Sequence, residues 1–588
     1  MLNRMKNRVL DLIVAPDLPA LPTSSGGPSH SSSQNFVNNK HLPDKFIYAR
    51  PGFLNLSTQD ELKASADHNL RPIIVPRDLN AMPWYSGYAE CINSGKSQYN
   101  EDQAAFSKQI LSHPSKQYPD LPYMYFGIFD GHASHGCSLA ASLQFHHILH
   151  EKLVDIIELL LPKKDPVPES TIPIPLFFVK NISKDELIVG ALESAFHEMD
   201  SVIDSDRDKY RNAGGCTACV ALFILGKMYI ANAGDSRAIL CQKLPQDIFR
   251  AEIDPKHLQN GDTEYHVFST ALSWDHTPDT ERPRLLSTGK INPSLMCDSY
   301  SAIEFAKKPL SRDLGARVMY RQGTMRGWAF KTLTREDLRC PTLVTGEGKR
   351  SRLMGTIGVT RGFGDHDLRA LGSGALIKPF LSAQPDVNFR DLTKVISIPG
   401  DNNEDGEYGI LVMATDGLWD VTEINDVAHT VFKTLKKYPT ERHRYTMAAQ
   451  ELVARARGRI NESGHWRLND SRAAATVDDI SVFVIPVYQY YKEFVEWEKL
   501  CNDTSNNKDE SSEGGSSNRM NISSDEPDIE INKLVLNDDT VSDVTEAKEE
   551  NIISKADVDT SVDKTNGSTI EKINDDNLDF DTRENEDM

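Results

Sequence analysis

The sequence lacks any run of 18 apolar residues, and no apolar segment near its start precedes a small-residue cleavage site. It therefore predicts neither a membrane-spanning helix nor a secretory signal peptide. Cysteine is scarce: eight cysteines are spread over 588 residues without the spacing of a disulfide framework. Cys216 and Cys219 form a CxxC pair inside an apolar run, so we expect core thiols rather than a redox or zinc site. These absences favour a cytoplasmic protein in a reducing compartment.

Basic residues are outnumbered, with 65 Lys and Arg against 86 Asp and Glu and a formal net charge of -21. Residues 501–588 hold 25 of the acidic residues and only 8 of the basic ones, so the rest of the chain is nearly neutral. Because no basic stripe is present, we expect no nucleic-acid partner. Few aromatic and many polar or acidic residues predict that 490–588 is an acidic disordered tail.

The amino terminus has the opposite character. Residues 1–14 place apolar side chains on one helical face and Arg4, Lys6 and Arg8 elsewhere. An amphipathic helix in peripheral contact with cytosolic membrane faces, a mitochondrial transit peptide and a frayed terminus all fit this pattern. Residues 15–45 are rich in Ser, Pro, Gly and Asn, which predicts a disordered linker.

Residues 46–487 have the mixed periodicity of a folded domain. Runs 218–225 and 227–231 pivot on Gly226 and, with 236–240, predict an antiparallel meander of three strands. Later strands are expected at 409–415 and 480–487, and helices at 138–161, 185–206 and 447–460. Ser183 and Glu186 have the spacing of a capping box for the second helix. The composition of 162–183 and 287–350 is typical of insertions. We expect an α+β body of antiparallel sheets covered by helices.

Acidic residues recur where the apolar runs end. Asp130 ends the run in FGIFDGHASHG, Asp416 ends the one in ILVMATDGLWD, and Asp478 precedes the one in DDISVFVIP. Glu101 and Asp235 lie in similar positions. One Asp-Gly is as readily a hairpin turn as a site, but several such ends suggest one pocket that holds hard cations. Oxygen ligands suit magnesium or manganese, and two such ions could activate a water.

The same motifs give the chain a family resemblance. They occur in the order found in metal-dependent protein phosphatases, the PPM or type 2C family, and span about 80–487. The motifs are NED at 100–102, FGIFDGHASHG at 126–136, GGCTACVALF at 214–223, ANAGDSRAIL at 231–240, WDHTP at 274–278, GTIGVTRGFGDHDLR at 355–369, ATDGLWDV at 414–421 and DDISVFVIP at 478–486. ARPGFLNLS and LVTGEGKRSRLMGTIGVTRG look most like the H/J/M branch of the family.

The resemblance implies an αββα sandwich of two antiparallel sheets flanked by helices, with a two-metal centre that binds Mn2+ or Mg2+ and splits phosphoserine and phosphothreonine in proteins. The implied metal ligands are Glu101, Asp130, Gly131, Asp416 and Asp478, with Asp235 and Asp420 at a third, weaker site. Asp130 would bridge the ions, and Asp102 and Asp479 would not be ligands. His132 matches the general acid, whereas His135 has no counterpart and is expected at the surface.

Two departures bear on the substrate. The arginine that the family usually carries four residues before the glutamate is Ser97 here, which leaves Lys96 as the candidate for phosphate binding. Residues 287–350 fall where the family carries its flap and predict a docking surface for phosphoprotein substrates. The branch resemblance suggests phosphorylated Rab-type GTPases. The alternative is a catalytically weak relative that acts as a scaffold or adaptor.

Overall fold

The computed structural model describes residues 47–509, with gaps at 163–180, 207–208, 211–212, 246–264, 297–302, 324, 339–341, 371–373, 396–403, 470 and 472. The chain divides into units 1–514 and 515–588. The predictions for 1–14 and 15–45, most of the 162–183 insertion and the tail beyond residue 509 lie outside the described residues. None of the helices in the described ranges has the length and apolarity needed to cross a bilayer.

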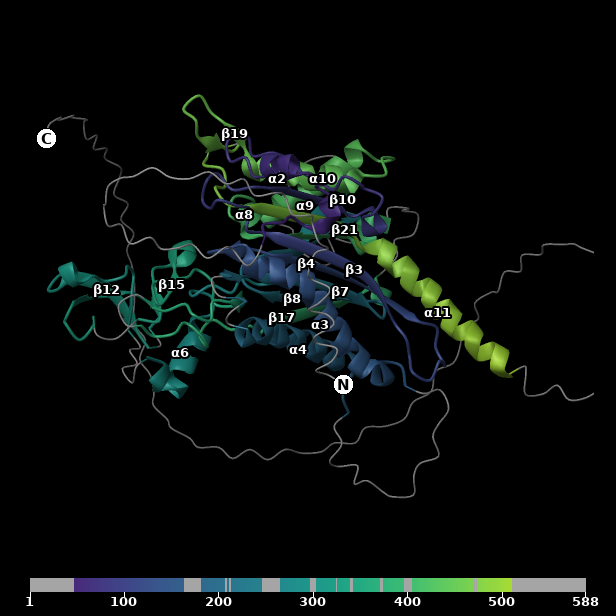
Figure 1. Cartoon of the computed structure of the whole chain (residues 1–588), viewed down its shortest axis with the longest axis horizontal. Helices are drawn as coiled ribbons and strands as arrows, with labels where there is room; N and C mark the ends of the chain where they lie inside the picture. The colour runs from purple at the N-terminus through teal and green to yellow at the C-terminus, as the bar shows by residue number, and fades with distance from the viewer. Residues whose placement is uncertain are drawn as a thin grey trace, which may run out of the picture. The chain divides into compact units, whose positions relative to one another are not determined.

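Two antiparallel sheets form the centre of the first unit (Figure 1). The five-stranded sheet has the order β17 (Asp386–Asp391), β8 (Lys227–Ala233), β7 (Ala218–Ile224), β4 (Leu121–Phe129) and β3 (Gln103–Leu111). The six-stranded sheet has the order β1 (Ile73–Ile74), β2 (Gly87–Cys91), β21 (Ile480–Pro486), β18 (Ile410–Ala414), β9 (Arg237–Pro245) and β10 (Tyr265–Ala271).

Helices cover the outer face of each sheet. Helices α3 (Gly136–Leu160) and α4 (Lys184–Ser205) pack on the five-stranded sheet, and α9 (Ile424–Lys437) and α10 (Arg444–Arg457) pack on the six-stranded one. In β4, Tyr123 and Tyr125 face the helices, whereas Met124 and Phe126 face the opposite sheet. The central strands are thus buried on both sides, which explains their continuous apolar runs. The predicted α+β, αββα sandwich is confirmed.

Shorter elements connect these layers. The short helices are η1 (Gly52–Leu54), α2 (Gln59–Ser65), η2 (Pro83–Tyr85), α6 (Arg282–Ile291), η5 (Pro293–Met296), η6 (Ser311–Asp313), η7 (Gly348–Arg350), η8 (Leu392–Lys394), α7 (Glu404–Tyr408) and α8 (Asp416–Trp419). Two of the smaller sheets consist of two-residue strands: β16 (Phe363–Gly364), β6 (Gly215–Cys216) and β5 (Gly131–His132) form one, and β19 (Arg459–Ile460) and β20 (Trp466–Arg467) form the other.

The predicted meander is only partly correct. Strands β7 and β8 form the expected hairpin, in which Ile224 pairs with Lys227 and the two turn residues, Leu225 and Gly226, have φ of 51° and 73°. These angles are typical of a type I′ turn. The third strand, β9, instead crosses to the other sheet and pairs with β10 and β18. The chain redirects at Gly234, where φ is 133° and a Cβ would overlap the Thr217 side chain.

The helix predictions are confirmed with small shifts at the ends, and the Ser183–Glu186 capping box is present. The tail prediction is wrong for its first twenty residues, because α11 (Val487–Asp509) continues directly from β21. Tyr490 and Trp497 of this helix are buried, since its aromatic residues pack against both large cores. Sequence composition averaged over the tail concealed this short aromatic segment.

Residues in the 287–350 segment contribute to a separate five-stranded sheet, which we call the flap sheet. Its order is β13 (Ala329–Thr332), β12 (Arg317–Gln322), β11 (Ile303–Phe305), β14 (Val344–Thr345) and β15 (Arg352–Leu353). The buried carboxylate of Glu304 accepts hydrogen bonds from Arg282 of α6 and from Arg321 of β12, the latter at 2.6 Å. This ion-pair network ties the flap sheet to α6.

Candidate metal centre

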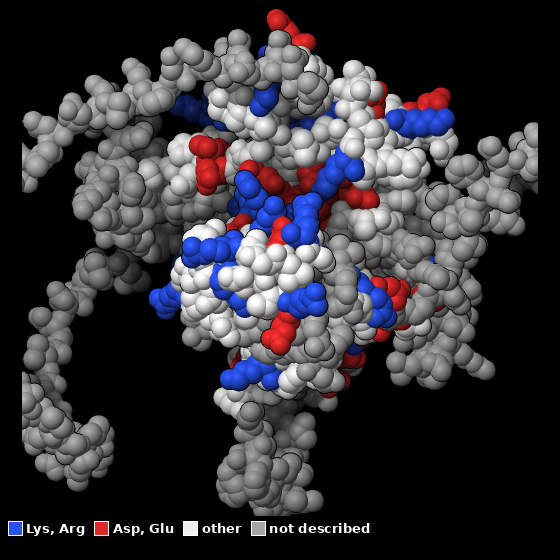
Figure 2. All heavy atoms as spheres, turned by 90° about the vertical axis from the view of Figure 1, so that its left-hand side faces the viewer, with Lys and Arg blue, Asp and Glu red and all other residues white. Residues whose placement is uncertain are grey.

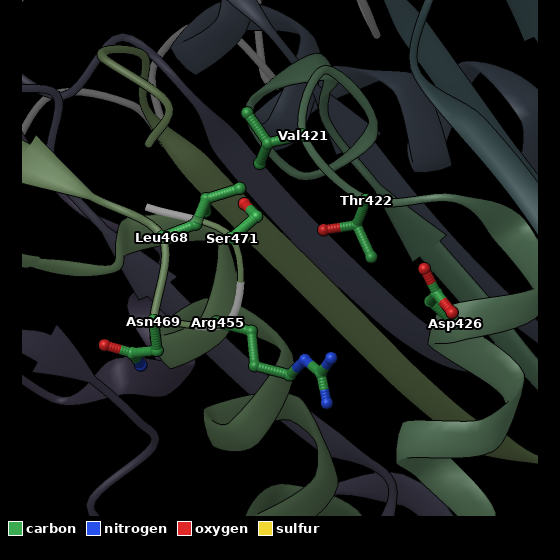
Figure 3. Close-up of a pocket in the computed structure, with 7 residues that line it drawn as sticks. All are labelled: Val421, Thr422, Asp426, Arg455, Leu468, Asn469 and Ser471. Atoms are coloured by element: carbon green, nitrogen blue, oxygen red, sulfur yellow. The ribbon is translucent and has the colours of Figure 1, made fainter. Parts of the chain in front are cut away.

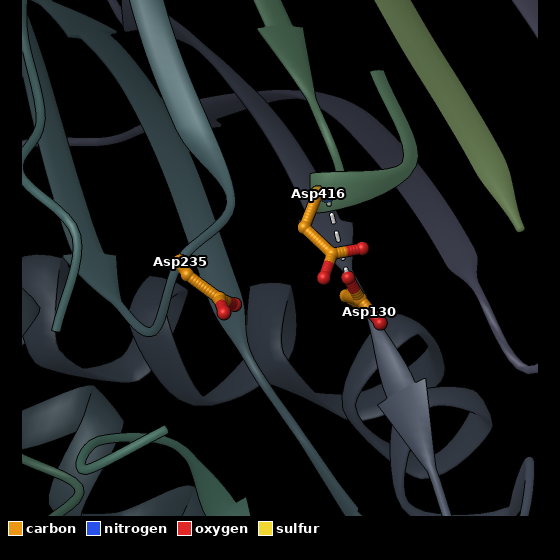
Figure 4. Close-up of side chains that lie close together, drawn as sticks. All are labelled: Asp130, Asp235 and Asp416. Carbon is orange, nitrogen blue, oxygen red and sulfur yellow. Dashed lines mark hydrogen bonds between the residues drawn. The ribbon is translucent and has the colours of Figure 1, made fainter. Parts of the chain in front are cut away.

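Three carboxylates from separate parts of the chain meet where the strands end. Asp130 lies between β4 and β5, Asp235 lies in the turn between β8 and β9, and Asp416 opens α8 just after β18. One carboxylate oxygen of each lies within 4.8 Å of the other two (Figure 4). The Asp416 backbone N–H also points at Asp130 Oδ2, 3.5 Å away. The structure therefore brings together three of the acidic residues that the sequence singled out.

Both Asp-Gly pairs require their glycine for packing. A Cβ on Gly131 would overlap the carbonyl oxygen of Glu101, and a Cβ on Gly417 would overlap that of Asp479. Each glycine thus lets the backbone of one acidic motif lie directly against another. Glycine is therefore needed in these motifs because the backbone of another segment lies close to it, as well as for the turn.

Glu101 and Asp478 lie beside this group but outside the 4.8 Å cluster. Their loops are joined by Asp479, whose carboxylate accepts hydrogen bonds from the backbone N–H of Asn93 at 2.8 Å and of Glu101 at 3.0 Å. Ser138 Oγ donates to the Glu101 carbonyl at 2.5 Å. Asp102 accepts from Thr415 Oγ1 at 2.8 Å. Asp102 and Asp479 therefore connect the loops that present the candidate ligands.

Burial raises the pKa of the three carboxyl groups of the cluster and of Glu101 beside it. It raises the pKa of Asp130 and Asp416 well above the usual range, helped by repulsion from neighbouring carboxylates. The pKa of Asp235 rises to about 6 and that of Glu101 to about 7, again mainly through burial. Ionising these crowded, buried carboxyl groups is unfavourable when no cation is bound. A set of oxygen-only donors of this kind fits hard divalent cations such as Mg2+ or Mn2+.

His132 lies at the edge of the cluster and contacts an aspartate that the sequence analysis did not single out. Its Nε2 is 2.6 Å from Asp365 Oδ2. Burial opposes protonation of His132, but the Asp365 carboxylate outweighs it and the pKa of the imidazole is raised. Gly215 makes this pair possible, because a Cβ there would meet both side chains. Asp365 was visible in the GFGDHD motif, but nothing in the sequence linked it to His132.

The expectation that His135 lies at the surface is wrong. It is 5% exposed, and its ring lies edge-on to Tyr48 and Tyr99, with centroids 5.4 Å from each. Tyr48 comes from the segment before the first strand, so a contact over such a sequence distance could not be read from a local pattern.

Two lysines approach the acidic group. Lys96 Nζ forms an ion pair with Asp478, and Lys349 Nζ, from the segment between β14 and β15, lies 3.0 Å from Asp420 Oδ1. Ser97 is turned inward, with its Oγ donating to the Tyr99 carbonyl at 2.6 Å. On the face shown in Figure 2, acidic side chains gather near the centre with Lys and Arg side chains beside them. The lysine from the flap side was not predicted.

A separate pocket of about 190 Å³ lies beside the segment that follows α8 in the chain (Figure 3). It is lined by Val421, Thr422, Asp426, Arg455, Leu468, Asn469 and Ser471. Its lining residues offer one carboxylate beside one guanidinium, so it lacks the several anionic oxygens of a divalent-cation site. None of the predicted site residues lines it.

The chain is similar to known protein phosphatases. A family model described as Protein phosphatase 2C matches residues 86–285 and 340–463. Human protein phosphatase 1H is 37% identical over 549 residues, covering 83% of this chain and 99% of that protein. Mouse protein phosphatase 1J is 38% identical and covers 83% of this chain and 98% of that protein. A solved serine-threonine phosphatase 2C from Toxoplasma gondii has 16% identity, covers 71% of this chain and 99% of that one, and has a TM-score of 0.37.

The resemblance to this phosphatase family, inferred from the ordered motifs, is thereby confirmed, and so is the prediction of an enzyme. The chain belongs to the protein phosphatase 2C family of metal-dependent protein serine/threonine phosphatases, in the branch of phosphatases 1H and 1J.

Proposed function

We propose that this phosphatase acts on phosphoserine and phosphothreonine in folded proteins at a centre of two divalent cations, Mn2+ or Mg2+. The observation that carries the proposal is the meeting of the Asp130, Asp235 and Asp416 carboxylates within 4.8 Å. The proposed ligands are Glu101, Asp130, Gly131 through its carbonyl, Asp416 and Asp478, with Asp235 and Asp420 at a third, weaker position.

Divalent cations held by these residues would supply an activated water and charge neutralisation for the phosphoryl group. Protonation of the leaving group is proposed to come from a residue of the chain. His132 Nε2 faces Asp365, so Nδ1 carries the proton that passes to the departing serine or threonine oxygen. Asp365 fixes the ring and keeps it protonated nearer to neutral pH.

Lys96 is proposed to hold the substrate phosphate in place of the arginine missing at Ser97. Its ammonium already lies at the acidic group and is free to turn to a phosphate once Asp478 serves as a ligand. We expect Lys96→Met to raise KM for a phosphopeptide about tenfold and to leave kcat nearly unchanged. The reason is that the variant loses a charge-assisted hydrogen bond to the phosphate that is equally strong in the ground state and in the transition state. Steady-state kinetics at saturating Mn2+ measure this. A lower kcat at constant KM would place Lys96 in the chemical step instead.

The flap sheet is proposed to dock the protein that carries the phosphate, with phosphorylated Rab-type GTPases as the candidate substrates. Met319 of β12 and Phe330 of β13 are cross-strand partners and are 44% and 59% exposed. Arg317 lies over the Phe330 ring at 5.1 Å. An exposed apolar pair beside a cation is typical of a protein contact.

The assay compares a phosphorylated Rab-type GTPase with the matching phosphopeptide, in Mn2+, in Mg2+ and in EDTA. We expect turnover of both substrates with cation and none in EDTA, and kcat/KM about tenfold higher for the GTPase, as one good docking contact would give. The double variant Met319→Ser, Phe330→Ser should remove the difference and leave peptide turnover unchanged.

Each part of this proposal can fail separately. Turnover in EDTA would exclude the two-cation centre. Equal kcat/KM for GTPase and peptide would exclude the flap as a docking surface for this substrate. A folded protein that turned over neither substrate would favour the scaffold or adaptor function.

A further inference from the structure

Two buried arginines lie in the segment that precedes β2, before the family match begins at residue 86. Arg71 is 0% exposed, and the Arg50 side chain is 1% exposed. Buried arginines are rare because removing a guanidinium from water costs free energy that only well-formed hydrogen bonds offset. The partners of these two side chains therefore show what each one holds in place.

Arg50 connects β2 to the loop that carries Glu101. Its Nε and Nη2 donate to the two carboxylate oxygens of Glu90 at 2.8 and 2.7 Å. Its remaining nitrogen, Nη1, donates to the backbone carbonyls of Asn100 at 3.1 Å and Asp102 at 2.5 Å. The first carbonyl belongs to the peptide unit that precedes Glu101 and the second to the peptide unit that follows Asp102, so the guanidinium holds the chain on both sides of Glu101.

Arg71 does the same for the loop that carries Asp478. Nε donates to the Ile92 carbonyl at 2.7 Å, and Nη1 and Nη2 donate to the carbonyls of Thr476 and Asp478 at 2.9 and 3.0 Å. All three nitrogens thus bind backbone oxygens. The Trp466 ring lies 5.3 Å from the guanidinium, and Arg457 Nη1 donates to the Arg71 carbonyl at 2.7 Å. Arg71 is held from several sides, as a positioning residue must be.

We infer that Arg50 and Arg71 form a clamp that positions Glu101 and Asp478 for cation binding, so that the segment before residue 86 is a working part of the metal centre. The inference rests on the proposed function, which makes these two residues ligands. The clamp acts through backbone carbonyls and contributes no ligand of its own. Its loss should therefore weaken metal affinity, as the loss of groups that orient ligands commonly does.

The test measures Mn2+ binding to chelator-stripped protein by isothermal titration calorimetry. Arg71→Met should raise the Kd for Mn2+ about tenfold or more. Arg50→Lys keeps a charge for Glu90 but loses the nitrogen, Nη1, that reaches the carbonyls of Asn100 and Asp102, so it should raise the Kd as well. Arg71→Lys retains part of the carbonyl contacts and should bind with intermediate affinity.

The matched control is Arg444→Met. Arg444 opens α10 and pairs with Asp405 of α7, before the start of β18, whereas Asp416 follows the end of that strand. This variant should lose thermal stability but keep the wild-type Kd. The clamp is refuted if Arg71→Met and Arg50→Lys lower the melting temperature as Arg444→Met does and leave the Kd unchanged.

The outcomes separate this inference from the proposed function. If Arg71→Met does not fold, Arg71→Lys and Arg50→Lys carry the test, and a wild-type Kd in both refutes the clamp while the cation centre stands. Wild-type protein that binds no Mn2+ would instead refute the cation centre, and the clamp with it.

Discussion

Asp130→Asn is expected to abolish phosphopeptide turnover and, at the same time, to make the metal-free protein more stable to heat. Asp130 is one of the proposed ligands of the cations, which would contribute several kcal/mol of transition-state stabilisation. Because about 1.4 kcal/mol corresponds to a factor of ten in rate, we expect kcat to fall at least about 10³-fold. Activity and metal-free stability should therefore change in opposite directions.

The gain in stability follows from the sign of the pKa shift. Burial and the neighbouring carboxylates raise the pKa of Asp130 above its unfolded value, so its ionised form is less favourable in the folded state than in the unfolded one. Folding stability falls as the pH rises through the raised pKa. Near neutral pH a neutral asparagine removes this penalty.

Asp386→Asn is the control for which we expect the opposite change in folding stability. The hydrogen bond from His276 is the main reason that the pKa of Asp386 is lowered, to about 2, with the Arg361 charge as a further contribution. Its ionised form therefore stabilises the fold above the unfolded pKa, and this stability is lost only as the pH falls toward 2. Differential scanning calorimetry in EDTA should show a higher melting temperature for Asp130→Asn and a lower one for Asp386→Asn. A lower melting temperature for both would contradict the crowded-carboxylate argument.

The parts of this site that the sequence predicted share a local signature. Asp130 and Asp416 each end an apolar run and are followed by glycine, so the strand, its end and the turn are visible within a few residues. Asp235 lacks this signature, because it lies in a turn between two strands and is followed by serine. The layered fold could also be predicted from apolar patterns, because the apolar faces of long amphipathic helices and of strands are buried by packing against each other.

The rest depends on contacts between distant residues. The β9 strand has the pattern of its neighbours, and nothing in the predicted run 236–240 says which of the two sheets the strand joins. Arg71 and Nη1 of Arg50 bind carbonyl oxygens, which every residue possesses, so no side-chain pattern marks these partners. Asp365 meets His132 only because β5, β6 and β16 form a small sheet that closes the site.

His132→Ala is expected to lower kcat on a phosphoserine peptide about 10²-fold or more, the usual effect of losing a general acid. An alkoxide is a poor leaving group, so the serine oxygen needs a proton as the P–O bond breaks. On p-nitrophenyl phosphate, whose phenolate leaves readily without a proton, the same variant should lose much less. The ratio of the two kcat losses, measured at saturating Mn2+, is the diagnostic quantity. Equal losses on both substrates would mean that His132 orients the water or the phosphate rather than protonating the leaving group.

Asp365→Asn gives the matching pH test for the same proton. The carboxylate raises the pKa of His132, so activity that needs the imidazolium is lost only when the pH rises above that raised pKa. Removing the negative charge lowers the pKa, and the alkaline limb of the kcat profile should then move to lower pH for the peptide substrate. In the His132→Ala background the Asp365→Asn change should have no such effect, because the group whose pKa it controls is gone. An alkaline limb that stayed in place in the single variant would show that Asp365 holds the ring without controlling its proton.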